Sequence, residues 1–230
     1  MPEYCWSVFA ETLSNTQASL LRKLFEFKVV RVNLDFDQIM CASETPVVEE
    51  FFRQTGLDYR GSPIDRWLAL SHRAAREGSM SFEEAAVIEK PIWENPSVLM
   101  KAMPILEIQR YSERAHENGV IQTIVSTRIP GLREQTLDWI KIHYPWIPLD
   151  SVYIRGGLKT PKNVFKGIII DALGAEVHLE DAVDSAQAVL SYSDASVILF
   201  PRSSERGSFS GEERVIEIPD MSLWKNVYNA

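Results

Sequence analysis

The sequence has little of several features that mark particular classes of protein. It has two cysteines, Cys5 and Cys41, too few for a disulfide framework or a cysteine-based zinc site. No stretch approaches the roughly 20 consecutive apolar residues that a membrane-spanning helix needs. The first ten residues lack the basic region and apolar core of a signal peptide. We therefore expect no membrane segment and a reducing, cytoplasmic setting.

Positive charge is scarce relative to negative charge. The chain has 24 Lys and Arg against 32 Asp and Glu, so its formal net charge is −8. Binding to nucleic acid relies on Lys and Arg that neutralise phosphates, so this balance disfavours a nucleic-acid partner. A small anionic substrate remains compatible with it, provided that a metal ion and a few local cations neutralise the substrate.

The remaining composition is that of an ordinary globular protein. Of the 230 residues, 45% are hydrophobic, and no internal repeat or low-complexity segment stands out. This length suits one large domain, or one domain with a small insert. The sequence leaves the oligomeric state open.

Four short apolar runs organise the chain. They are rich in β-branched residues and nearly continuous in apolarity, which suits strands that are buried on both faces. Helical patterns lie between the runs, with apolar residues at a spacing near 3.6. The runs are residues 29–34 (VVRVNL), 120–125 (VIQTIV), 177–179 (VHL) and 196–200 (SVILF). The predicted helices are residues 16–27, 105–118, 132–143, 164–173 and 184–190.

Strands that alternate with helices predict an α/β fold, with a Rossmann-like parallel sheet flanked by helices. Residues 41–103 interrupt this alternation, because they contain helical patterns and no convincing strand. We therefore predict a helical cap at residues 41–103, inserted into a Rossmann-like core formed by residues 1–40 and 104–230.

Polar clusters follow three of the apolar runs. Asp35-Phe36-Asp37 follows the first run, residues 126–128 (STR) follow the second, and Glu180-Asp181 follows the third. Because the carboxyl ends of parallel strands share one edge, these carboxylates and hydroxyls should converge there. Taken singly, each cluster also fits a solvated turn or a helix N-cap. Their order and spacing together favour a catalytic interpretation.

The converging groups are those that phosphoryl transfer requires. Mg²⁺ prefers oxygen ligands. Asp35 and Asp181 can each supply a side-chain oxygen, the backbone carbonyl of Asp37 a third, and Glu180 a further one, directly or through water. Asp35 would attack phosphorus to form an aspartyl phosphate. Asp37 points the same way as Asp35, and would protonate the leaving oxygen and then deprotonate the hydrolytic water.

The segments VVRVNLDFDQIM, IQTIVSTR and VHLEDAVDSA, with a lysine region between the last two, resemble the four motifs of the haloacid dehalogenase superfamily. The resemblance spans roughly residues 29–200. It implies a Rossmann-like core, a helical cap, bound magnesium and aspartyl-phosphate chemistry. Asp37 favours a phosphatase, since the dehalogenases of the superfamily lack this second aspartate. One departure is Gln38, at a position that is often glycine in the family.

The family uses a lysine to hold the nucleophile and the phosphoryl oxygens. Lys159, Lys162 and Lys166 are the candidates. A helix of about nine residues, counted back from Leu173, covers the height of the neighbouring strand, at 1.5 Å per residue against about 3.3 Å. This count places Lys166 at the level of the active site, and we prefer it, although Lys159 resembles a variant of the motif.

The second polar cluster supplies further candidates. We assign Ser126 a catalytic role, and Thr127 and Arg128 a role in binding the substrate. For Arg128, a surface salt bridge is an equal alternative. The cluster, followed by TLDWI at residues 136–140, is similar to the nucleotidase and polynucleotide-phosphatase branches of the family.

For three further residues, a role in packing is an alternative to a role in the functional site. His178 falls inside a predicted core strand, so we interpret it as a packed histidine. Trp67 and Trp93 fall in the predicted cap, where they could line a substrate pocket but are more simply explained as packing residues.

The sequence thus predicts a magnesium-dependent phosphomonoesterase that acts on a small phosphorylated metabolite. Our first candidate substrate is a (deoxy)nucleotide monophosphate. The alternatives are a phosphatase for sugar phosphates or polynucleotide 3′ ends, and a non-catalytic binding or scaffold protein of the same fold. Because specificity would be set by the cap, where no pattern is readable, the sequence does not decide among these substrates.

Overall fold

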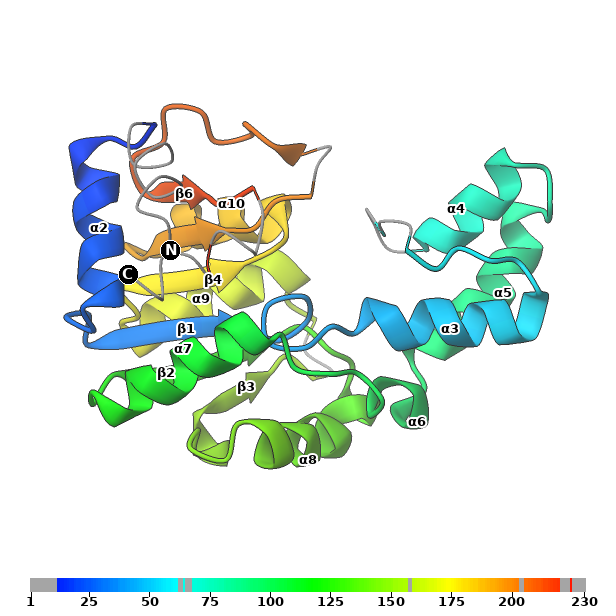
Figure 1. The fold of residues 1–230 in the computed structure, drawn as a ribbon, viewed down its shortest axis with the longest axis horizontal. Coiled ribbons are helices and arrows are strands. Elements are labelled where there is room, and N and C mark those ends of the chain that lie inside the picture. The colour runs from blue at the N-terminus through cyan, green and yellow to red at the C-terminus, as the bar shows by residue number, and fades with distance from the viewer. Residues whose placement is uncertain are drawn as a thin grey trace.

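A parallel sheet forms the centre of the computed structural model, which describes residues 12–61, 64, 68–156, 159–202, 205–219 and 224 (Figure 1). The six strands lie in the order β3-β2-β1-β4-β5-β6, and each neighbouring pair is parallel. This arrangement confirms the predicted α/β class. The strands are β1 (Arg31–Asp35), β2 (Ile121–Ser126), β3 (Val152–Ile154), β4 (Val177–Glu180), β5 (Ser196–Leu199) and β6 (Val215–Glu217). Trp67 lies outside the described residues.

Two groups of helices cover the two faces of the sheet. Helices α2, α7 and α8 pack with Val32 and Leu34 of β1 in the largest hydrophobic cluster. Helices α9 and α10 pack on the other face, against Val197 and Leu199 of β5. The helices are α2 (Asn15–Phe25), α7 (Leu106–Glu117), α8 (Arg133–His143), α9 (Lys162–Leu173) and α10 (Val183–Tyr192). Among the described residues, no helix is long and apolar enough to span a membrane.

Local sequence explains where several helices begin and end. Ser14 caps α2, because its side chain accepts the backbone N–H of Gln17, whose own side chain accepts the N–H of Ser14. Helix α9 ends at Gly174, which has a left-handed backbone with φ of 60°. A side chain with a Cβ disfavours that conformation, so glycine suits this helix end.

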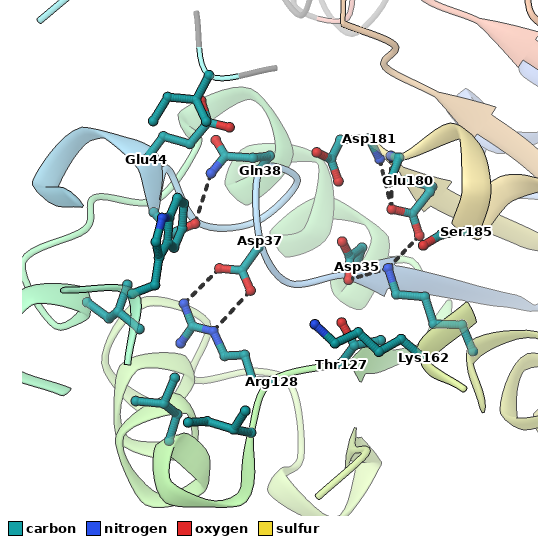
Figure 2. Close-up of a pocket in the computed structure, with 18 of the residues that line it drawn as sticks. Asp35, Asp37, Gln38, Glu44, Thr127, Arg128, Lys162, Glu180, Asp181 and Ser185 are labelled. Atoms are coloured by element: carbon teal, nitrogen blue, oxygen red, sulfur yellow. Dashed lines mark hydrogen bonds and ion pairs between the residues drawn. The ribbon is translucent and has the colours of Figure 1, made fainter. Parts of the chain in front are cut away.

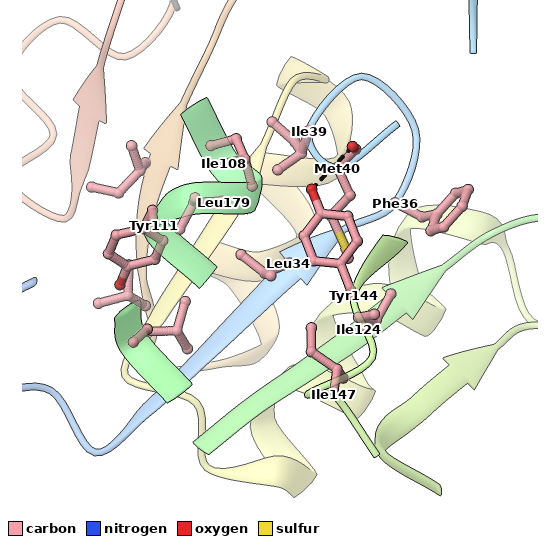
Figure 3. Close-up of a cluster of buried hydrophobic side chains, with 14 of the residues drawn as sticks. Leu34, Phe36, Ile39, Met40, Ile108, Tyr111, Ile124, Tyr144, Ile147 and Leu179 are labelled. Atoms are coloured by element: carbon pink, nitrogen blue, oxygen red, sulfur yellow. Dashed lines mark hydrogen bonds between the residues drawn. The ribbon is translucent and has the colours of Figure 1, made fainter. Parts of the chain in front are cut away.

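The segment that follows β1 is anchored in the hydrophobic core. The side chains of Phe36, Ile39 and Met40 are fully buried. The hydroxyl of Tyr144 donates a hydrogen bond to the carbonyl oxygen of Met40 at 3.2 Å (Figure 3). These contacts hold the turn that carries Asp37.

The helices between β1 and α7 form a separate group beside the sheet (Figure 1). They enclose a hydrophobic cluster of their own, to which the core adds Leu132. The two chain segments that lead into and out of this group are hydrogen-bonded, from Ala42 N–H to Met103 and from Ile105 N–H to Met40, both at 2.9 Å. These features agree with a cap at residues 41–103, whose exact limits stay a prediction. Its helices are α3 (Glu44–Thr55), α4 (Ala69–Arg76), α5 (Phe82–Trp93) and α6 (Pro96–Leu99).

Two of the six strands were not predicted from the sequence. Strands β3 and β6 contain three residues each, and they lie at the two edges of the sheet. The four predicted strands are those nearest the centre, and three of them, β1, β2 and β4, carry the polar clusters.

Helices α9 and α10 approach each other closely at Gly167. A Cβ atom at this position would lie 2.7 Å from the carbonyl oxygen of Ala188 and 2.8 Å from the Cβ of Tyr192. Glycine is therefore required here by the packing of two backbones, in a helix that otherwise favours residues with side chains.

We expect Gly167→Ala to lower the free energy of unfolding by about 1–3 kcal/mol, because the added methyl group overpacks the contact between α9 and α10. Urea unfolding would measure the change. The matched control is Gly131→Ala, where a Cβ would meet no heavy atom within 4 Å. A Gly167→Ala variant as stable as the wild type would show that the two helices can separate at no cost.

Candidate active site

Polar side chains converge where three neighbouring strands end. Asp35 ends β1, Ser126 ends β2 and Glu180 ends β4. Since β1 lies between β2 and β4, this edge is the point where the winding of the sheet changes direction, and ligands of α/β sheets bind at such points. A cavity of about 390 Å³ lies between this edge and the cap, and Asp35 and Glu180 line it (Figure 2).

Lys166 lies between the carboxylates of Asp35 and Glu180 and forms an ion pair with each of them. Its Nζ lies 2.9 Å from Asp35 Oδ1 and 2.6 Å from Glu180 Oε2, and the residue is 3% exposed. Lys166 lies one turn into α9, while Lys162 and Lys159 are exposed. Of the three lysines that the sequence offered, the structure brings Lys166 to the nucleophile candidate.

Glu180 has hydrogen-bond partners on both oxygens. Its Oε2 accepts from Lys166 and lies 3.0 Å from His178 Nε2. Its Oε1 accepts the backbone N–H groups of Asp181 and Ala182, both at 3.1 Å. Burial acts to raise the pKa of Glu180, but Lys166 and His178 outweigh it and hold the pKa below its ordinary value. Glu180 is thus a fixed carboxylate with fully occupied oxygens.

Three carboxylates crowd together at this point. Asp35, Glu180 and Asp181 each offer an oxygen, and these oxygens lie within 4.8 Å of one another. Burial and the nearby Glu180 raise the pKa of Asp35 to about 8, and the same two causes raise the pKa of Asp181 well above its ordinary value. The cluster therefore holds more buried negative charge than Lys166 compensates.

This donor set fits a hard divalent cation. Of the described residues that line the cavity, six are carboxylates and four are cations, so the site has an excess of negative charge. Mg²⁺ prefers carboxylate and carbonyl oxygens and tolerates a partly hydrated shell. Asp35 and Asp181 are the side chains best placed to hold it, because the oxygens of Glu180 are already occupied by donors.

Asp37 lies beside Arg128, on the cap side of Asp35 (Figure 2). The guanidinium donates to both carboxylate oxygens, at 3.0 and 2.7 Å, and to Thr136 Oγ1 at 3.1 Å. It also stacks on the ring of Phe36, 4.3 Å from the centroid. Burial acts to raise the pKa of Asp37, but Arg128 outweighs it and holds the pKa below its ordinary value.

Arg128 lines the cavity, and its side chain is paired with protein groups. The side chain is 7% exposed, and its Nε, Nη1 and Nη2 atoms all donate to protein groups. The substrate-binding role that the sequence suggested for Arg128 stays a prediction. The salt bridge that was the alternative is present, but it lies in the candidate site and is largely buried.

The two hydroxyl residues after β2 differ in exposure. Ser126 is 1% exposed, and its Oγ accepts the backbone N–H of Arg128 at 3.3 Å. Thr127 is half-buried and lines the cavity. The structure therefore places Thr127 in contact with the cavity and Ser126 just behind it, and the catalytic role predicted for Ser126 stays a prediction.

Gln38 has a left-handed backbone, with φ of 60°. This conformation is favourable for glycine and costs energy for a residue with a Cβ. It explains why a glycine would suit the position. The Gln38 side chain offsets part of this cost by donating a hydrogen bond from Nε2 to Ser43 Oγ at 2.8 Å.

Sequence reasoning missed Arg202, which lines the cavity. Arg202 lies 3.5 Å from both Asp181 and the cap residue Glu44. It follows β5 closely, so the reasoning that selected Asp35 and Glu180 could have selected it too. Lys162, at the start of α9, also lines the cavity. Trp93 of the cap lines it as well, and its indole N–H donates to the buried Glu89 at 3.2 Å.

Comparison with known proteins identifies the fold. No family model matches the sequence, and no curated protein matches it significantly. Solved structures do match it. A candidate phosphatase from Clostridium difficile aligns with a TM-score of 0.56 and 14% identity, over 87% of this chain and 98% of that one. A haloacid dehalogenase family hydrolase from Deinococcus radiodurans R1, with bound phosphate and sodium, aligns with a TM-score of 0.55 and 17% identity, over 83% and 91%.

A third match has a sugar bisphosphate bound. CbbY from Rhodobacter sphaeroides, solved in complex with xylulose-1,5-bisphosphate, aligns with a TM-score of 0.50 and 14% identity, over 82% of this chain and 93% of that one. The chain therefore has the haloacid dehalogenase-like fold, as the sequence resemblance implied. At these identities the comparisons define the fold, and the site must supply the argument for activity.

We expect Lys166→Met to lower the free energy of unfolding by about 3–5 kcal/mol, because it leaves buried carboxylates without their cation. Urea unfolding in metal-free buffer would measure the change. Lys141→Met removes an exposed lysine from α8 and should change stability by no more than about 0.5 kcal/mol. Equal effects of the two substitutions would contradict the charge balance described above.

Proposed function

We propose that this protein is a magnesium-dependent phosphomonoesterase whose nucleophile is Asp35. The observation that carries the proposal is the position of Asp35, which ends the central strand and contacts the cavity, Lys166 and the acidic cluster. A carboxylate flanked by a lysine and a candidate cation site has the groups needed to approach a phosphate dianion. The fold, shared with hydrolases of the haloacid dehalogenase family, supports the same conclusion.

The proposed reaction has two steps. In the first, an Asp35 oxygen forms a bond to phosphorus while the bond to the leaving oxygen breaks. Asp37 would donate a proton to that oxygen after it has been protonated and has separated from Arg128, because the contact with Arg128 holds Asp37 ionised in the described structure. In the second, Asp37 accepts a proton from water, the water oxygen attacks phosphorus, and the bond to Asp35 breaks to release phosphate. Lys166 lies against Asp35 Oδ1 in the structure and would balance the charge of the phosphoryl group.

Magnesium would supply charge neutralisation at the phosphoryl oxygens when it is bound. Asp35 and Asp181 would hold it, with the backbone carbonyl of Asp37 as the third ligand from the chain. Our sequence-based assignment also gave Glu180 as a ligand, directly or through water. Because both oxygens of Glu180 accept hydrogen bonds in the structure, we propose that any contribution of Glu180 to the metal runs through water.

The cavity suits a small substrate, because its volume of about 390 Å³ falls within the range of small-molecule sites. Trp93, the last residue of α5, contributes an aromatic side chain to its lining. A (deoxy)nucleotide monophosphate therefore remains our first candidate. The bisphosphate bound by CbbY is a reason to test sugar phosphates beside it. Polynucleotide 3′ ends are disfavoured by the net charge of −8.

Removal of the metal should abolish activity. We expect no release of phosphate from para-nitrophenyl phosphate in EDTA, and full recovery when Mg²⁺ is added. Mg²⁺ alone should also raise the melting temperature, because it binds the folded acidic cluster and stabilises it by mass action. Asp181→Asn should reduce that thermal shift. Full activity of the metal-free protein would rule out the metal assignment.

Loss of the nucleophile should remove turnover and leave the fold intact. We expect Asp35→Asn to reduce kcat by about 10⁴-fold or more, since no covalent intermediate can form. Phosphate release over a panel of nucleotides and sugar phosphates is the measurement. Asp171→Asn, on the exposed side of α9, is the matched control and should keep wild-type kcat. If Asp35→Asn retained a tenth of the wild-type rate, the nucleophile would lie elsewhere.

A non-catalytic protein of this fold is the remaining alternative. It predicts that the wild type and Asp35→Asn release no phosphate from any ester of the panel. The same assay therefore separates this alternative from the proposal.

A further inference from the structure

His178 is a buried polar residue that the proposed mechanism does not use. It lies in β4 two residues before Glu180, so both side chains point to the same face of the sheet, the face covered by α9. Its side chain is fully buried, and its Nε2 atom lies 3.0 Å from Glu180 Oε2. The same oxygen accepts the hydrogen bond from Lys166.

The contact defines which ring nitrogen carries the proton. The oxygens of an ionised carboxylate only accept hydrogen bonds, so Nε2 of His178 must be the donor. The Nδ1 atom has no hydrogen-bond partner in the part of the chain that the structure describes. In a neutral ring with its proton on Nδ1, the lone pair of Nε2 would face the carboxylate of Glu180, which is unfavourable because both groups are acceptors.

The histidine completes the set of donors that fixes Glu180. Two backbone N–H groups hold Oε1, and Lys166 and His178 hold Oε2, so the carboxylate cannot rotate without losing hydrogen bonds. With one donor removed from Oε2, Glu180 could turn toward the carboxylate cluster that it shares with Asp35 and Asp181. Lys166 would then lose one of the two carboxylates between which it lies.

We propose that His178 is a positioning residue of the active site: it fixes Glu180 as the group that aims Lys166 at Asp35. The inference rests on the proposed function, because the aim of Lys166 matters for turnover only if Asp35 reacts with a phosphate ester. It assigns a role to a residue whose sequence context suggested only packing in a strand.

Three variants of the full chain test this role, with para-nitrophenyl phosphate and Mg²⁺. His178→Leu removes the donor and should lower kcat by about ten-fold while KM changes by less than about two-fold, by analogy with the loss of groups that orient metal ligands. His178→Gln retains an N–H donor and should restore kcat to within about three-fold of the wild type. Val197→Ala, opposite His178 on β5, should lower the melting temperature without changing kcat.

A structural role alone would give a different pattern. If His178→Leu kept the wild-type kcat, or if His178→Gln were as impaired as His178→Leu, the proposal would be overturned. A second measurement does not depend on activity. The chain has four histidines, so NMR of protein labelled with ¹⁵N-histidine can resolve the ring of His178. We expect the neutral Nε2–H tautomer, with a signal that shifts in Glu180→Gln.

The NMR result separates the two proposals. A wild-type protein that hydrolyses no ester would refute the proposed function. The NMR spectrum would then still show whether His178 donates its Nε2–H to Glu180, because that measurement does not depend on activity. A neutral ring protonated on Nδ1 alone would overturn the inference even in an active enzyme, because Nε2 could then not donate to Glu180.

Discussion

The structure depends on one electrostatic constraint, the burial of several carboxylates beside a single lysine. Asp35, Glu180 and Asp181 lie close enough to share one cation, Lys166 lies between Asp35 and Glu180, and Arg202 lies 3.5 Å from Asp181. Unpaired charge in a protein interior is costly, so the elements around the cluster must hold it firmly. Parallel pairing of β1 with β4 sets the first two carboxylates side by side, and α9 brings the lysine to them.

The same constraint extends into the second layer of the structure. For Lys166 to reach the sheet edge, α9 must lie flat against the sheet while α10 packs beside it. Gly167, the next residue along the helix, permits the close approach of α10. The charge that remains uncompensated explains why the proposed chemistry includes a divalent cation. A site with balanced charge would have no electrostatic reason to recruit one.

The sequence predicted the features that are local or periodic. The central strands, the flanking helices and the clustering of Asp35, Glu180 and Asp181 follow from apolar runs and from the geometry of parallel sheets. Lys166 was preferred by a count of helix rise against strand rise, and the structure shows that lysine against Asp35. These arguments succeed because a regular element converts sequence distance into spatial distance.

The features that escaped prediction depend on contacts between distant segments. The ion pair between Asp37 and Arg128 joins two loops, and the two residues are 91 positions apart in the sequence. The guanidinium of Arg128 also stacks on the ring of Phe36, and neither loop has a sequence pattern that predicts this contact. Arg202 bridges the core and the cap through Asp181 and Glu44, and no spacing rule connects these three positions. The bond between His178 and Glu180 is local, yet its meaning depends on a lysine from another element.

The way the cap joins the core has a consequence for the history of the chain. The entering and leaving segments are hydrogen-bonded to each other at Ala42 and Met103, so the core meets the insert through a closed neck. The entropic cost of closing a loop rises only slowly with loop length. Helices could therefore be added to or deleted from the insert with little effect on the sheet. Such a neck would let the insert change in sequence and length while the strand ends that carry Asp35 and Glu180 keep their arrangement.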